Sequence, residues 1–228
     1  MKAQIWSKII VVFNILMSIC YSSFAGEENY RKARTLQREG KFDDAIEAYK
    51  DYLTEPAAVK DLKDEKLKIY TDALVQLMNN YQSKGEPDAC ISALEAVFKA
   101  VPVLQQELLR DYNSVLGYAL SRTERMAEAE ATMLKALALP LYSANSERYF
   151  RDYAYAAAVF YSNPDYQQEV INWCLEAMQQ AQFADNPSGK QWVIAMLGSL
   201  YKREGNLNKA LELFEQSKEE AKSRNDEL

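Results

Sequence analysis

Hydrophobic positions recur along this chain at intervals of three and four residues, which is the spacing of one face of an α-helix. The pattern is clearest near the C-terminus, where Gly205 and Asn206 separate two amphipathic segments. The face of the first segment consists of Ile194, Leu197, Gly198 and Tyr201. The face of the second consists of Leu207, Ala210, Leu211, Phe214 and Ser217. Because glycine adopts a left-handed conformation without a Cβ clash, the pattern predicts two packed helices joined by a tight turn at Gly205.

Small residues occur where the two predicted helices would meet. Gly198 and Ala210 leave little side chain between the helices, which allows their backbones to approach closely. The order of residue types resembles the tetratricopeptide repeat (TPR) family, and the matching residues are Leu197, Gly198, Tyr201, Gly205, Ala210 and Phe214. This resemblance implies an architecture and not a particular chemistry.

The same pattern recurs in four earlier copies, near residues 26–56, 61–102, 104–140 and 145–182, before the last copy at 188–223. The small residue of each second helix falls at Ala45, Cys90, Ala129, Val170 and Ala210, which gives spacings of 45, 39, 41 and 40 residues. Because the usual TPR period is about 34, longer helices or connections are expected. The predicted fold class is all-α, a right-handed α-solenoid of about five TPR-like helix pairs with a period near 40.

The N-terminal residues predict an export signal. Two lysines precede an apolar run at residues 9–20, and small residues ending at Ala25 follow this run. This order is typical of a signal peptide at 1–25, cleaved after Ala25 and followed by a helical repeat domain at 26–228. We therefore expect an exported, periplasmic or extracytoplasmic protein. An uncleaved membrane anchor is the alternative, although Asn14 dilutes the run relative to the roughly 20 apolar residues that span a bilayer.

Composition narrows the chemistry. The chain of 228 residues contains no histidine, which excludes Ser-His-Asp and Cys-His catalysis and histidine-based zinc sites. A net charge of −6 without a basic cluster argues against a nucleic-acid surface. Cys90 and Cys174 lie where the repeat places a buried residue and are expected to be small core residues. No cofactor, metal site or enzymatic activity is predicted.

The resemblance implies a concave groove lined by the first helix of each pair. The residues expected to project into it are Tyr30, Arg34, Gln37, Asn79, Tyr118, Tyr155 and Trp192. Aromatic residues and arginine are frequent hot spots of protein interfaces, so a protein or peptide partner is expected. No nucleic acid and no small-molecule substrate is expected. Packing between repeats is the competing interpretation for Tyr155 and Trp192.

Two functions follow. The first is a non-enzymatic binding module, because a signal peptide followed by long-helix repeats resembles the exported N-terminal TPR segment of bacterial membrane-bound sensor kinases and transcription regulators. In that family a transmembrane helix and an output domain would follow, so membrane contact is expected only through the signal peptide, an anchor or a missing C-terminal segment. The second is a complete envelope scaffold or assembly factor, dimeric through an uncovered edge at Leu213 and Phe214.

Overall fold

The computed structural model of the chain describes residues 27–55, 64–101, 106–140, 146–181 and 187–226. Regular structure within these ranges is entirely helical, and the helices pack pairwise as TPR-like repeats. The all-α prediction is therefore confirmed. The predicted signal peptide at 1–25 lies outside the described residues. Contacts divide the chain into two compact units, Met1–Leu108 and Leu109–Leu228.

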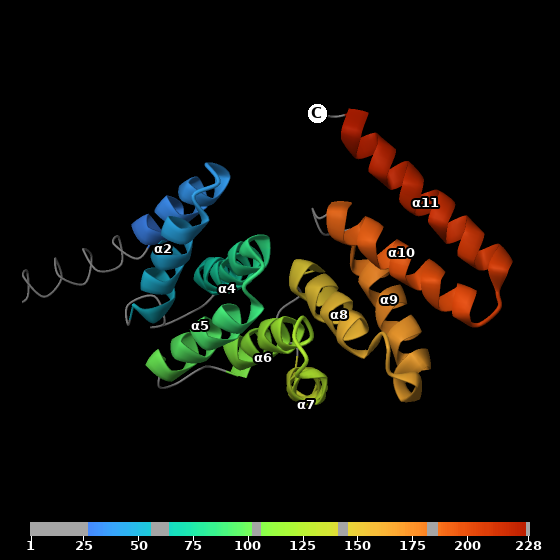
Figure 1. Ribbon diagram of the computed structural model, residues 1–228, viewed down its shortest axis with the longest axis horizontal. Coiled ribbons are helices and arrows are strands. Elements are labelled where there is room, and N and C mark those ends of the chain that lie inside the picture. The colour runs from blue at the N-terminus through green and yellow to red at the C-terminus, as the bar shows by residue number, and fades with distance from the viewer. Residues whose placement is uncertain (1–26, 56–63, 102–105, 141–145, 182–186, 227–228) are drawn as a thin grey trace, which may run out of the picture. The chain divides into compact units, whose positions relative to one another are not determined.

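The first unit is built from a helix at residues 27–38, α2 (Phe42–Thr54), α4 (Asp64–Lys84) and α5 (Pro87–Ala100) (Figure 1). Helix α2 packs against both α4 and α5, and α4 also packs against α5. Tyrosines fill much of the space between these helices. The rings of Tyr52 and Tyr70 lie 6.0 Å apart, and the Tyr70 hydroxyl donates to the carbonyl oxygen of Leu53 over 2.8 Å.

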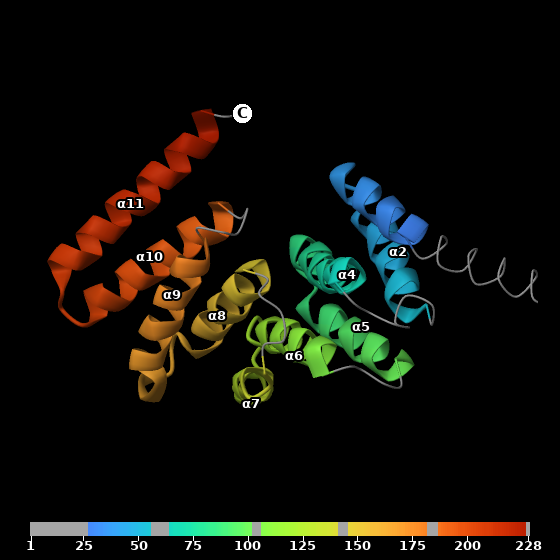
Figure 2. The same ribbon diagram turned by 180° about the vertical axis from the view of Figure 1, so that it is seen from behind.

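The second unit follows the boundary within α6 (Gln106–Leu120) and contains α7 (Met126–Leu137), α8 (Ser146–Phe160), the short 3-10 helix η1 (Pro164–Tyr166), α9 (Gln167–Ala181), α10 (Pro187–Arg203) and α11 (Leu207–Asp226). From α7 onward each α-helix packs against the next one along the chain (Figures 1 and 2). The second unit is therefore a row of helices in sequence order.

The turn at Gly205 has the predicted left-handed conformation, with a φ of 78°. The amide of Gly205 donates to the carbonyl oxygen of Lys202 over 3.1 Å, and the amide of Asn206 donates to that of Tyr201 over 2.9 Å. These two bonds satisfy carbonyl groups at the end of α10 that have no partner inside the helix. The same pair of bonds ends the first helix of two earlier repeats, at Gly40 and Gly85.

Small residues bring the paired helices close together, as the sequence predicts. Ala45, Cys90, Ala129, Val170 and Ala210 are all buried. In the second unit a Cβ added to Gly117 would lie 3.1 Å from the backbone nitrogen of Met133 on α7. A part of the extra repeat length lies in longer first helices, since α4 has 21 residues.

The last helix corrects one part of the predicted pattern. Leu207 and Leu211 were expected on the packed face of α11, but they are 64% and 59% exposed. Leu213, expected at an uncovered edge, is instead buried. Helix α11 packs against α10 along a stripe that includes Ala210 and Leu213, and the leucines at 207 and 211 lie outside this stripe.

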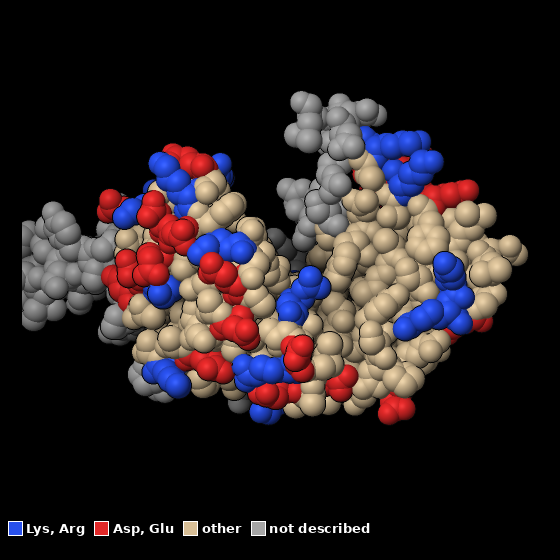
Figure 3. Space-filling view, viewed as in Figure 1, with Lys and Arg blue, Asp and Glu red and all other residues tan. Residues whose placement is uncertain are grey.

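The surface differs between the units on the face drawn in Figure 3. Acidic and basic side chains are interspersed over the first unit, whereas uncharged residues form a broad surface over α8 to α10. Among the described residues, no helix combines the length and the apolar character needed to cross a bilayer.

Candidate binding pocket in the second unit

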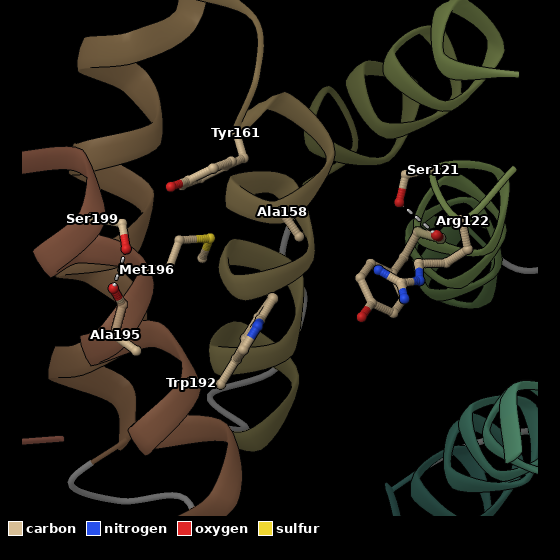
Figure 4. Close-up of a pocket in the computed structure, with 9 residues that line it drawn as sticks. Ser121, Arg122, Ala158, Tyr161, Trp192, Ala195, Met196 and Ser199 are labelled. Carbon is tan, nitrogen blue, oxygen red and sulfur yellow. Dashed lines mark hydrogen bonds between the residues drawn. The ribbon is translucent and has the colours of Figure 1, made fainter. Parts of the chain in front are cut away.

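A pocket of about 370 Å³ lies among α6, α8 and α10 of the second unit. These are the first helices of three successive pairs, which the resemblance to TPR proteins assigns to the groove. Side chains of these helices and of the turns after α6 and α8 line the pocket; they are Tyr118, Ser121, Arg122, Ala158, Tyr161, Trp192, Ala195, Met196 and Ser199. Figure 4 shows Met196 between the rings of Tyr161 and Trp192, with Arg122 extending from the end of α6 toward them.

Three of the predicted groove residues form an aromatic cluster at one end of this pocket. Tyr118, Tyr155 and Trp192 are spaced by 37 residues and come from α6, α8 and α10 respectively. The rings of Tyr118 and Tyr155 stack with centroids 4.2 Å apart and an interplanar angle of 6°. Trp192 meets Tyr118 edge-on at 6.5 Å and 76°. The equal spacing in the sequence therefore places the three rings side by side.

The aromatic residues of the cluster differ in whether they pack between helices or are exposed to solvent. Tyr155 does not line the pocket and supports Tyr118 from behind through the stacked contact. Trp192 is 39% exposed, which leaves a large aromatic surface open to a partner. Tyr155 therefore takes part in packing between helices, and the predicted groove role of Trp192 stays a prediction.

The polar groups of the pocket have defined roles. The Ser121 hydroxyl donates to the carbonyl oxygen of Tyr118 over 2.7 Å, and the Ser199 hydroxyl donates to that of Ala195 over 3.0 Å. Because a hydroxyl has one proton, both serines present only acceptor lone pairs to the pocket. Arg122 is exposed, and its guanidinium forms no ion pair with any residue in the described part of the chain.

A second arginine stabilises one wall of the pocket. The guanidinium carbon of Arg203 lies 4.6 Å from the centre of the Tyr161 ring, and Arg203 donates to the Tyr161 carbonyl oxygen over 2.9 Å. This cation–π contact and hydrogen bond hold Tyr161 in place after the end of α8. Among the lining residues in the described ranges of the chain, none is aspartate or glutamate.

The tyrosines of the cluster are neutral at physiological pH. Burial raises the pKa of Tyr118 and that of Tyr155 above the ordinary value near 10. Deprotonation is therefore disfavoured, and these hydroxyls act as hydrogen-bond donors or acceptors but not as bases. The pocket provides apolar contact area, acceptor oxygens and a positive charge.

The other predicted groove residues belong to the first unit, where most of them are engaged with α4. The Tyr30 hydroxyl donates to Asp72 Oδ2 over 2.7 Å, and Arg34 lies 3.5 Å from the same oxygen. Gln37 Nε2 donates to Gln76 Oε1 over 2.9 Å. These half-buried contacts join the helix at 27–38 to α4. Asn79 lies on α4 and is also half-buried.

The two cysteines outside the N-terminal segment are buried, and several acidic side chains are ion-paired. Cys90 and Cys174 are buried free thiols, and burial raises the pKa of each to about 12. Asp43 and Glu219 are exposed acidic side chains that form ion pairs with Lys84 and Lys222 respectively. No group of three or more potential metal ligands is found within the described part of the chain.

Sequence reasoning missed most of the pocket-lining residues. Ser121, Ala158 and Ala195 each follow a member of the aromatic cluster by three residues, and Arg122 and Met196 follow by four. Residues at these intervals share one helical face. Five of the lining residues could therefore have been predicted by following the helical face for one turn beyond each aromatic residue.

The pairwise packing of the helices resembles that of helical repeat proteins of the TPR type. Residues 193–228 match the family model described as "Tetratricopeptide repeat". This match covers the last helix pair, where the sequence pattern is also clearest.

Solved structures share the arrangement over most of the chain. BtubC (BKLC) from P. vanneervenii is 19% identical with a TM-score of 0.61, and the similarity covers 91% of each chain. MamA from Desulfovibrio magneticus RS-1 is 15% identical with a TM-score of 0.53, covering 87% of this chain and 96% of that one.

A third structure is the signal transduction ATPase with a tetratricopeptide repeat sensor from Pyrococcus horikoshii, which is 16% identical with a TM-score of 0.58. The similarity covers 85% of this chain and 28% of that chain. At these identities the similarities concern the fold alone. No curated protein matches the chain in sequence.

Proposed function

We propose that the chain is a non-enzymatic interaction module that binds a segment of another protein in the pocket of the second unit. The observation that supports this proposal most directly is the partly exposed Trp192, held beside Met196 and Tyr161 in a depression formed by three successive first helices. Binding hot spots are rich in tryptophan, tyrosine and arginine, and all three residue types line this pocket.

A capture experiment with a matched control tests the proposal. The purified chain, the Trp192→Ala variant and the Leu175→Ala variant are each used to capture partners from the source cells. Leu175 lies on α9 with the same 39% exposure as Trp192, but it does not line the pocket. We expect Trp192→Ala to reduce capture of a specific partner at least tenfold and Leu175→Ala to leave it unchanged. Equal capture by the two folded variants would rule out the pocket.

The cellular setting belongs to the same proposal. We propose that residues 1–25 direct export and that the helical domain is the extracytoplasmic sensory or interaction part of a signalling protein. The support is the order of basic, apolar and small residues before Gly26. N-terminal sequencing of the protein isolated from its own cells tests this: a start at Gly26 is expected, and a start at Met1 with the chain in the cytosolic fraction would contradict it.

A second candidate is a scaffold that is dimeric through its C-terminal edge. The exposed leucines at 207 and 211 on α11 favour it. Phe214 is unsuitable for the test, because its ring lies against Gly198. Light scattering after size-exclusion chromatography should instead compare the chain with Leu211→Asp. A dimer that becomes a monomer in the variant supports the scaffold, and a monomer in both samples contradicts it.

A further inference from the structure

The charge of the pocket is the feature that limits what its occupant can be. Among the described lining residues Arg122 is the charged side chain, and it forms no ion pair with a residue that the structure describes. Arg203 adds a second positive charge beside the ring of Tyr161. Since no carboxylate is found among the lining residues that the structure describes, their local field favours an acidic group in the occupant.

The hydrogen-bonding capacity of the pocket distinguishes a peptide from a simple anion. Both serine hydroxyls already donate to main-chain carbonyl groups, so Ser121 and Ser199 can only accept. An occupant must therefore supply N–H or O–H donors near the serines as well as a carboxylate near Arg122. A polypeptide has a backbone amide at every residue except proline, whereas an anion without protons, such as sulfate or chloride, has acceptors only.

The apolar lining of the pocket favours an occupant with a large apolar side chain. Trp192, Met196 and Ala158 contribute apolar lining to the pocket, and Figure 4 shows them below the Tyr161 ring in this view. Burial of an aromatic or branched aliphatic side chain against this surface removes apolar area from water. Because Trp192 is partly exposed, the pocket is open on one side, and the backbone of a bound segment can pass over it.

On the basis of the proposed function, we infer that the occupant is an extended protein segment in which a large apolar side chain is flanked by an acidic side chain. The apolar side chain packs against Trp192 and Met196, the carboxylate pairs with Arg122, and backbone amides donate to the serine oxygens. The overall negative charge of the chain does not oppose this pairing, because charges beyond about 8–10 Å are screened at physiological salt.

Defined peptides test the inference. We use dye-labelled pentapeptides with blocked ends that have a central phenylalanine between two aspartates, two asparagines or two lysines, and a fourth peptide with alanine between two aspartates. Fluorescence anisotropy measures the Kd of each for the purified chain and for three variants. These are Arg122→Gln, Trp192→Ala and the control Lys135→Gln, which removes the same charge from an exposed position on α7 outside the pocket.

The aspartate–phenylalanine peptide should bind about two- to fivefold more tightly than the asparagine peptide at low salt, the range expected for an exposed ion pair. The lysine peptide should bind more weakly than either. Arg122→Gln should abolish the preference for aspartate without changing the Kd of the asparagine peptide, whereas Lys135→Gln should retain it. The alanine peptide should lose binding to all variants.

The outcomes separate the inference from the function on which it rests. If the aspartate and asparagine peptides bind equally and Trp192→Ala weakens both, the preference for an acidic segment is contradicted. Binding of a protein segment in the pocket is then still supported. Binding that Trp192→Ala leaves unchanged would contradict the pocket itself. Tighter binding of phenylacetate than of the peptides would replace a protein segment with a small aromatic acid. Absence of binding by the aspartate–phenylalanine peptide at 1 mM would contradict the inference.

Discussion

Two helical glycines in the second unit lie close to a neighbouring helix, but their neighbours differ in kind. A Cβ added to Gly117 would lie 3.1 Å from the backbone nitrogen of Met133 and 3.3 Å from the carbonyl oxygen of Ala129. A Cβ added to Gly198 would lie 3.0 Å from a ring carbon of Phe214. Backbone atoms of α7 can move only with their helix, whereas the partly exposed ring of Phe214 can rotate.

Gly117→Ala is therefore expected to destabilise the chain more than Gly198→Ala. Alanine gains about 1 kcal/mol over glycine from helix propensity. At Gly117 the forced separation of α6 and α7 should outweigh this gain, giving a net loss of about 1–2 kcal/mol. At Gly198 the two effects should nearly cancel. Midpoints of urea unfolding measure the difference, and a Gly117→Ala variant as stable as the parent would contradict the close packing.

The buried thiols give a prediction about reactivity. The pKa of Cys90 and of Cys174 is raised by burial from about 9 to about 12. At pH 8 the thiolate fraction is then about a thousandfold smaller than for an exposed cysteine, and the thiolate is the reactive form. In a Cys20→Ser background, both thiols should react with Ellman's reagent only as fast as the chain unfolds. Rapid reaction of either thiol in the folded chain would place it at the surface.

The same raised pKa values affect stability at high pH. Because the folded-state pKa exceeds the unfolded one, the unfolded chain releases protons first as the pH rises. The contribution of the two thiols to the free energy of unfolding is fully present below pH 9 and is lost between about pH 9 and pH 12. Burial raises the pKa of Tyr49 to about 12, so Tyr49 lowers the stability in the same way above pH 10. Urea midpoints measured from pH 7 to pH 11 should be level at first and then fall. A rising midpoint above pH 9 would contradict this assignment.

At the scale of the elements, a buried ion pair joins three helices of the second unit. Arg110 Nε on α6 donates to Asp152 Oδ2 on α8 over 2.7 Å, and both side chains are almost completely buried. Arg110 also donates to the carbonyl oxygens of Ala136 over 3.2 Å and of Leu139 at the end of α7. Helix ends leave carbonyl groups without intrahelical partners, and Arg110 satisfies them here.

Removing one partner of this pair should be costly. Asp152→Ala leaves the Arg110 charge buried without its carboxylate, and such changes destabilise proteins by about 3–5 kcal/mol. The double variant Arg110→Met, Asp152→Leu should recover a large part of this loss, because neither charge of this pair remains and Arg151 keeps its partner Asp111. Urea unfolding of the parent, the single variants and the double variant gives the coupling energy. If the stability loss of the double variant equals the sum of the losses in the two single variants, the coupling energy is zero and the two side chains do not depend on each other.

The helices themselves were predictable because their signals are local. Each of these signals lies within one helix pair. They are the spacing of apolar residues, the turn glycines such as Gly205, and the small residues at helix contacts such as Ala129. The packed face of α11 was not fully predictable, since Leu207 and Leu211 have the helical spacing of core residues but lie outside the contact with α10. Periodicity identifies a helical face, and only the neighbouring helices determine how much of that face is buried.

At the scale of the whole molecule, the two units use their first helices differently. In the first unit, Tyr30, Arg34 and Gln37 are engaged by polar side chains of α4. In the second unit, helix α10 and the turn after α6 present Trp192 and Arg122 to a pocket. The sequence register placed Tyr30, Arg34, Gln37 and Trp192 on first helices. It did not single out Arg122, and it contained no information on the partners Asp72 and Gln76. Such long-range pairs are therefore the part of the site that a repeat pattern leaves undetermined.

The central claim is that a protein segment binds between α6, α8 and α10, and site-specific photocrosslinking in the source cells tests it most directly. A benzoylphenylalanine is introduced at Ala195, which lines the pocket, or at Leu175 on α9 as the control. We predict a discrete protein adduct from position 195, which the aspartate–phenylalanine peptide displaces, and no such adduct from position 175. The same adducts from both positions, or none that the peptide displaces, would contradict the account.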